Sequence, residues 1–427
     1  MQNKLITTIF ILLISLTFTA RGQKLVNSPY SRFNIGTLSP VGSFRSLGMG
    51  GFTTSLRDNS SINFSNPASY SNLDTNSFVF DFGIDYSKNK LSDGTTNWST
   101  QDMNFCHLLM GFPLAKGWGV ALGIVPITNG YYKISESVLE DSPDYDPLTG
   151  EYTTTHAGEG GFTNFFLGSG IQINKNFSVG ANITVLLGQI KRINQFDFID
   201  NYHVFSNNST ERMQLSGVNF KYGAQYTASL KNDYFLNAGV SLNSNKYYHS
   251  KYEHFAFKYT TYGTTDTISY VSDDTTSAYI PGTLSVGVSF GKKNKFTAGV
   301  DFSTTKWSIS KIPGGSNFAA DTKSLLFGAE LIPDKFSNYS YLKRVEYRIG
   351  GHIADNYLIV NGNQVKEYGA SIGLGVPLRR SLSKTNIYFD ITRKYGAAGS
   401  ILPTENYYTI GLSLNLYDFW FIQRKYD

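Results

Sequence analysis

The stretch "VNFKYGAQYTASL" (residues 218–230) decides the fold, because apolar and polar residues alternate along it without a break. Every even-numbered position from Val218 to Leu230 holds an aliphatic or aromatic residue. The odd-numbered positions hold Asn, Lys, Gly, Gln, Thr and Ser. Successive side chains of a β-strand point to opposite faces, so this period of two predicts a strand with one apolar and one polar face.

The same alternation recurs along most of the chain, as in "FVFDFGIDY" (78–86) and "FSVGANITVLL" (177–187). The polar faces consist mainly of Gly, Ser, Thr and Asn, and only 16% of all residues are charged. A soluble β-sandwich also alternates, but its surface usually carries many charges. Small polar residues instead suit the packed, wet interior of a barrel whose outer face meets lipid. The sequence therefore predicts an all-β protein, a transmembrane antiparallel β-barrel that satisfies its own backbone hydrogen bonds.

About fourteen strands are predicted, an even number as in bacterial single-chain barrels. Their expected spans are 76–89, 99–113, 117–138, 160–174, 176–196, 210–230, 233–256, 268–290, 294–309, 321–333, 342–357, 365–377, 384–397 and 404–421. The connections after the second, fourth, sixth and eighth strands are short, and those after the third, fifth and seventh are long. Because short turns face the periplasm in such barrels, both chain ends are predicted to be periplasmic, in the outer membrane of a Gram-negative bacterium. The connection at 334–341 is longer than this rule expects.

Residues 1–22 have the pattern of a secretory signal peptide, with Lys4, an apolar run from Leu5 to Phe18 and small residues before Gln23. A membrane anchor is the alternative, although the run is short for a span of about 20 residues. The formal net charge of +5 is spread along the chain without a basic cluster, which argues against nucleic acid as a partner. The single Cys106 excludes an intrachain disulfide.

Residues 23–75 precede the first predicted strand and contain the glycine-rich "LGMGG" (47–51) and the polar "RDNSS" (57–61). They are too polar for lipid. Their aromatic and apolar residues argue against a disordered periplasmic tail, which is the alternative. A fourteen-stranded barrel has a wide lumen, and large barrels are either aqueous or plugged. This segment is therefore predicted to fold into the lumen as a plug, or hatch, with residues 76–427 forming the barrel.

The stretch "SLGMGGFTTSLRDNSSINFSNPASYSNLDTNSFVFDFGIDY" (46–86) resembles the hatch and first strand of FadL/TodX-type outer-membrane transporters of long-chain fatty acids and other hydrophobic compounds. Asn66, Pro67 and Ala68 match the Asn-Pro-Ala motif of that family's hatch. Outside residues 45–90 the resemblance rests on strand number and loop lengths, which many barrels share. The stretches "SPYSRFNIGTL" (28–38) and "FIQRKYD" (421–427) resemble Bacteroidota members in particular.

The resemblance implies passive transport in which the ligand leaves the lumen sideways, through a gap that a kink in the third strand opens in the wall. The third predicted strand carries Pro126 and Gly130. A proline in mid-strand implies unpaired backbone, which a membrane tolerates only beside a cavity. The alternative is that Pro126 lies near a strand end or in a bulge. Phe52, Phe64 and Tyr70 of the predicted plug are candidates for lining the inner end of a ligand path.

No enzymatic activity is predicted. The six His residues have no metal-binding spacing, no GxSxG motif occurs, and no helix is expected after the GxG pairs, so no catalytic residue, metal or cofactor is assigned. Three functions remain open. The first is a channel for passive uptake of hydrophobic small molecules, surrounded by outer-membrane lipid, with lateral exit. The second is a non-transporting barrel that binds other outer-membrane proteins as a partner or shuttle subunit of a secretion or assembly machine. The third, an aqueous porin, is weakened by the small, weakly charged inward side chains.

Overall fold

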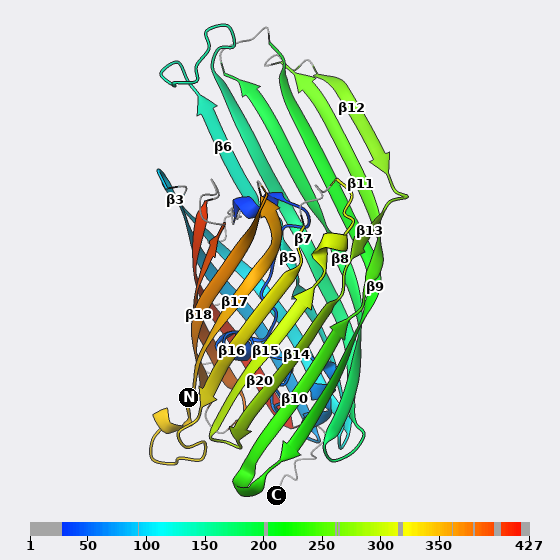
Figure 1. Ribbon diagram of the computed structural model, residues 1–427, viewed down its shortest axis with the longest axis vertical. Coiled ribbons are helices and arrows are strands. Elements are labelled where there is room, and N and C mark those ends of the chain that lie inside the picture. The colour runs from blue at the N-terminus through cyan, green and yellow to red at the C-terminus, as the bar shows by residue number, and fades with distance from the viewer. Residues whose placement is uncertain are drawn as a thin grey trace, which may run out of the picture.

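The alternating stretches form the wall of a closed antiparallel barrel in this computed structural model (Figure 1). The structure describes residues 28–92, 94–199, 204–260, 263, 265–314, 319–360, 362–378, 381–396 and 403–419. The predicted signal peptide (1–22) and the stretch "FIQRKYD" lie outside these residues. No helix in the described ranges is long and apolar enough to cross a membrane.

Within the described residues the wall has fourteen strand positions, which confirms the predicted fold class and number. Most positions are single strands, namely β2 (Ser77–Ser92), β3 (Asn97–Ala115), β7 (Tyr152–Gln172), β8 (Phe177–Phe198), β9 (Ser206–Ser229), β15 (Phe296–Thr305), β16 (Thr322–Leu331), β17 (Glu346–Val360), β18 (Asn363–Pro377), β19 (Lys384–Tyr395) and β20 (Thr404–Phe419). The barrel closes where β20 pairs with β2, from Ser77 opposite Phe419 to Ser92 opposite Thr404.

Three positions are interrupted, although the sequence predicts one continuous strand for each. The third holds β4 (Trp118–Pro126) and β6 (Tyr132–Val138), and between them lies the short strand β5 (Thr128–Asn129), which is not part of the barrel sheet. The seventh holds β10 (Tyr234–Asn243) and β11 (Lys246–Tyr259), and the eighth holds β12 (Thr265–Asp273), β13 (Ser277–Ile280) and β14 (Thr283–Lys292). In the third, the interruption begins at a proline, which has no N–H to donate to a ladder.

Side chains alternate across the wall as the sequence predicts. In β9, Phe220 and Tyr226 are 40% and 51% exposed, whereas Asn219 and Gln225 are 4% and 1% exposed. The apolar face of the strand therefore looks outward and the small polar face looks into the barrel. A soluble sheet that covers a core has the opposite arrangement.

The two ends of the barrel differ in their connections. At the end that carries Ser77 and Phe419, β7 is joined to β8 by residues 173–176 and β14 is joined to β15 by 293–295, but 332–345 between β16 and β17 is long. The eleventh strand begins at Glu346 rather than at residue 342, because Leu342–Arg344 forms the 3-10 helix η5. At the other end, β6–β9, β11 and β12 continue past the rest of the wall as a tall sheet (Figure 1).

The described part of the N-terminal segment, 28–76, lies against inward-facing residues of the wall. It contains four short elements, η1 (Pro29–Arg32), β1 (Thr37–Leu38), α2 (Phe44–Leu47) and η2 (Pro67–Asn72). Ser28 Oγ donates a hydrogen bond to Glu405 (2.6 Å), near the end of the barrel where Ser92 pairs with Thr404. The hydroxyl of Tyr417 donates to Asp74 (3.0 Å) near the opposite end. The segment therefore runs most of the length of the barrel.

Candidate functional site

Inward-facing glycines let the N-terminal segment approach the backbone of the wall. A Cβ at Gly180 of β8 would collide with the carbonyl of Pro67, and one at Gly350 of β17 would collide with the backbone of Met49. On the side of the segment, Gly50 has a φ of +70°, a left-handed conformation that favours glycine. Segment and wall are therefore in contact backbone to backbone, at positions where no larger residue fits.

A buried network of ion pairs joins the segment to the wall. Arg45 of α2 donates through Nε and Nη2 to both carboxylate oxygens of Glu330 (3.0 and 2.7 Å) and also pairs with Asp58. Arg348 of β17 donates to the same Glu330 carboxylate (2.8 Å) and pairs with Glu346. Burial by itself raises the pKa of the Asp58 carboxyl, but the neighbouring Arg45 charge outweighs this effect and holds that pKa well below its ordinary value.

Sequence reasoning missed this network. Its signal was the presence of Glu330 and Arg348 at positions whose parity places them on the inward faces of their strands. Buried charges occur in proteins almost only as pairs, so two such residues on neighbouring strands pointed to further partners inside the barrel.

The predicted plug motif forms the start of η2. Asn66 caps this helix by accepting a hydrogen bond from the amide of Ala68 (3.2 Å), and Pro67 occupies its first turn. The Asn66 amide donates to the carbonyls of Thr54 (2.7 Å), Ala224 and Val240 (3.3 Å each). The motif residues thus lie together against β9 and β10.

Replacing Asn66 by Leu is expected to destabilise the protein by about 2 kcal/mol, because buried carbonyls would lose their donor and η2 its cap. Urea unfolding in detergent micelles measures this loss. The matched control is Asn59→Leu, since Asn59 is exposed and donates only to Asp74. Equal effects of the two substitutions would contradict the role of the Asn66 contacts.

The predicted ligand-path residues lie in two separate apolar clusters. Phe52 packs with Met49 and Leu56. Phe64 and Tyr70 pack in a larger cluster that also includes residues of the wall. Phe52, Phe64 and Tyr70 are 0%, 8% and 1% exposed. All three are therefore in closed packing, and their part in a ligand path stays a prediction.

The wall changes its pairing at the predicted opening. Pro126 is the last residue of β4, and it still pairs with Thr163 of β7. β4 pairs with β3 only as far as Ile124, and beyond Pro126 the short strand β5 pairs with β1 of the N-terminal segment. The Gly130 amide donates to the carbonyl of Gly160 (2.9 Å), and β6 continues along β7 alone. On β3 the ladder with β4 runs from Leu108 to Ala115, and the half from Asn97 to His107 pairs with β2.

Side chains bridge this discontinuity. The Asn129 amide of β5 lies 3.4 Å from acceptor oxygens of both Asp102 and Asn104 on β3. Asn104 in turn donates to Asp85 of β2 (3.1 Å), and the Cys106 thiol donates to the same carboxylate (3.1 Å). A chain of polar contacts therefore joins β5 to β3 and β2, beyond the end of the β3–β4 ladder.

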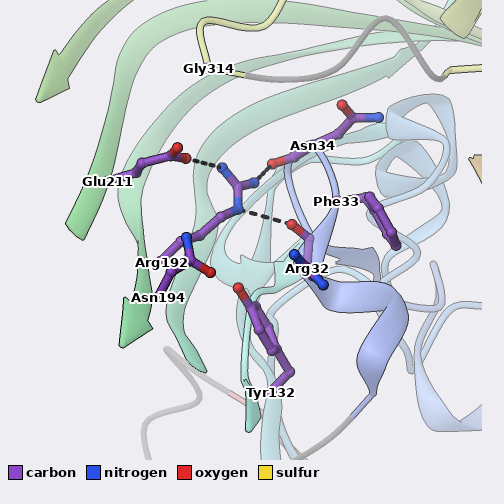
Figure 2. A pocket seen from close by; sticks show the side chains of 8 residues that line it. All are labelled: Arg32, Phe33, Asn34, Tyr132, Arg192, Asn194, Glu211 and Gly314. Carbon is purple, nitrogen blue, oxygen red and sulfur yellow. Dashed lines mark hydrogen bonds and ion pairs between the residues drawn. The ribbon is translucent and has the colours of Figure 1, made fainter. Parts of the chain in front are cut away.

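A polar pocket of about 190 Å³ lies beside η1, at the base of the tall sheet (Figure 2). Arg192 stands at its centre, donating to the carbonyls of Arg32 (3.0 Å) and Asn34, with Glu211 at 3.9 Å. Tyr132, Asn194, Phe33 and Gly314 complete the lining. This pocket offers hydrogen bonds and charge rather than an apolar surface. In the described part of the chain no group of three or more His, Cys, Asp or Glu residues is placed to hold a metal ion.

A family model described as BamG matches residues 1–427, the whole chain. No curated protein matches the sequence. Solved structures share the fold. The toluene transporter TbuX of Ralstonia pickettii superposes with a TM-score of 0.57 at 11% identity, covering 88% of this chain and 98% of that one. A FadL homologue of Pseudomonas aeruginosa gives 0.55 at 12% identity, with 89% and 98% covered. The monoaromatic hydrocarbon channel CymD gives 0.55 at 13% identity, with 90% and 98% covered.

Proposed function

The chain belongs to the BamG family, and we propose that it works as a partner subunit of an outer-membrane secretion or assembly machine rather than as a conduit. The observation that carries this proposal is the set of contacts between the N-terminal segment and the inner face of the wall. Residues 28–76 bring their apolar side chains into closed packing and pair Arg45, a charged side chain, with the wall. A lumen occupied in this way supports the view that the segment is a plug that excludes solutes.

The tall sheet supports a role in binding other proteins. On its outward face, Lys191 pairs with Glu159 (3.3 Å) and Arg212 pairs with Glu253 (3.2 Å), and such charges favour a position at or beyond the edge of the lipid. We therefore assign the part of the sheet beyond these pairs to the outside of the outer membrane, with the short-turn end in the periplasm. Among the described residues β6 pairs only with β7, and unpaired strand edges are common sites of contact with other chains.

A second candidate function is a passive channel for hydrophobic small molecules with lateral exit through the wall. The end of the β3–β4 ladder at Leu108 opposite Ile124, close to Pro126, favours it, because an interrupted ladder offers a way out of a barrel. Among the solved neighbours, TbuX is a toluene transporter and CymD is a monoaromatic hydrocarbon channel. The polar lining of the pocket beside η1 weighs against an apolar path through this barrel.

Native mass spectrometry of the protein, extracted gently from its own outer membrane, tests the proposal. We expect a stoichiometric complex with at least one other outer-membrane protein and no bound small molecule. A solitary barrel that carries a fatty-acid-like or aromatic ligand would overturn the assembly role and support the channel.

A further inference from the structure

The connection between β16 and β17 projects from the short-turn end of the barrel, where it is the lowest gold loop in Figure 1. Phe336, Tyr339 and Leu342 of this connection are 73%, 103% and 68% exposed. They follow Leu331 and precede Tyr347, the nearest exposed apolar residues on the two flanking strands. The three side chains therefore lie beyond the lipid-facing strands. Exposed apolar side chains outside the lipid-facing part of a barrel mark a contact surface.

The connection is held in place by both neighbouring turns. The amide of Ile332 donates to the carbonyl of Lys295 in the β14–β15 turn (2.7 Å). Within the connection, the Asp334 amide donates to the carbonyl of Lys343 (2.8 Å). On the other side the Tyr341 hydroxyl donates to the carbonyl of Pro377 (2.7 Å). A surface fixed before binding loses little conformational entropy when a partner docks.

The same surface is strongly basic. Residues 292–295 and 332–345 together hold six basic residues and one acidic residue, Asp334. The basic residues are Lys292, Lys293, Lys295, Lys335, Lys343 and Arg344. This excess equals the formal net charge of +5 of the entire chain. The two turns are far apart in sequence, so folding is what gathers the charge.

We infer that this basic turn surface, formed by residues 292–295 and 332–345, docks an acidic face of a second, periplasmic protein. Exposed aromatic residues surrounded by charges of one sign fit a partner of opposite charge with an apolar centre. The inference rests on the proposed function, since it supplies a contact through which a partner subunit joins its machine.

A second copy of this chain does not fit the surface. Its most acidic connection, 139–151 between β6 and β7, lies at the opposite end of the barrel. Two copies inserted the same way in one membrane keep these ends on opposite sides of the bilayer, so they cannot bring the acidic loop to the basic surface. The partner is therefore a different protein.

A photocrosslinking amino acid placed at Tyr339, in the full-length protein in its own outer membrane, tests the inference. We expect a crosslink to a protein that also co-purifies with the wild-type barrel. The substitutions Lys293→Glu and Lys343→Glu together should weaken this complex by about tenfold or more, because they reverse two exposed charges at the contact. The matched control is Lys175→Glu, in the β7–β8 turn at the same end. Migration as a heat-modifiable band verifies that each variant is folded.

The outcomes separate the inference from the proposed function. Loss of the complex in the double variant but not in Lys175→Glu supports the inference. A complex that survives the double substitution overturns the inference and leaves the proposed function standing. A wild-type barrel that purifies alone overturns both. A crosslink at Tyr339 to phospholipid, with vesicles containing phosphatidylglycerol retaining the wild type better than the double variant, overturns the inference in favour of membrane contact.

Discussion

Replacing Glu330 by Gln is expected to destabilise the folded barrel by about 3–5 kcal/mol, the cost of removing one partner from a buried ion pair. The carboxylate is 3% exposed and lies between two guanidinium groups, those of Arg45 and Arg348. Its negative charge is what balances them, together with Asp58 and Glu346. The Gln amide has the same shape but no charge, so the two buried guanidinium groups lose the negative charge that neutralises them. The amide nitrogen also cannot accept the hydrogen bonds that one carboxylate oxygen accepts.

The measurement is the urea concentration at half unfolding in detergent micelles, compared with that of Asp266→Asn. Asp266 pairs with Lys258 at 3.0 Å, but both side chains are exposed, so its loss should cost less than about 1 kcal/mol. If Glu330→Gln proved as mild as Asp266→Asn, the ion-pair network would not be what holds the N-terminal segment to the wall.

Replacing Gly350 by Val is expected to release part of the N-terminal segment from the barrel. The new side chain would occupy the place of the Met49 backbone, and backbone cannot move aside as a flexible side chain can. Overpacking of this kind costs about 1–3 kcal/mol when the neighbour can yield and more when it cannot. We expect the barrel to persist while the segment loosens. Backbone atoms make the hydrogen bonds that pair β17 with β16 and β18, and the substitution keeps these atoms.

Trypsin digestion of the folded protein detects this release, since Arg45 is buried in the native structure. The wild type should resist cleavage after Arg45, and Gly350→Val should be cut there. The matched control is Gly351→Val, the next residue on the same strand. Gly351 pairs with Phe327 on the outer face, and a Cβ there would meet mainly the edge of that ring at 3.0 Å. Cleavage of both variants to the same extent would argue against a specific contact at Gly350.

The alternation of the sequence predicted the wall well, as β9 illustrates, because the period of two is a local property of extended backbone. The alternation did not predict that β5, after Pro126, pairs with the N-terminal segment instead of with the wall. A proline indicates that a ladder hydrogen bond is missing, but the pairing of β5 with β1 joins Asn129 to Thr37, which is remote in sequence. A local sequence pattern carries no information about which distant segment pairs with the chain after the proline.

The candidate site was predictable in its parts rather than in its arrangement. The motif Asn66–Ala68 was identifiable from sequence, and its carbonyl partners on β9 and β10 were not. The sequence shows that glycines are frequent on the inward faces. That the N-terminal segment packs against these glycines became clear only from the closed barrel. The predicted roles of Pro126, Gly130, Phe52, Phe64 and Tyr70 in transport stay predictions, and so does the Bacteroidota origin.

By itself the sequence determined that this chain forms a fourteen-stranded barrel with its apolar residues outside, because side-chain direction in a strand follows from residue parity alone. The tertiary structure decided which distant residues meet inside the barrel and at its ends. Glu330 meets Arg45 across 285 residues, and two separate turns gather into one basic surface. Strand register and closure of the wall set contacts between residues so far apart in the chain. The local sequence around each residue does not specify them.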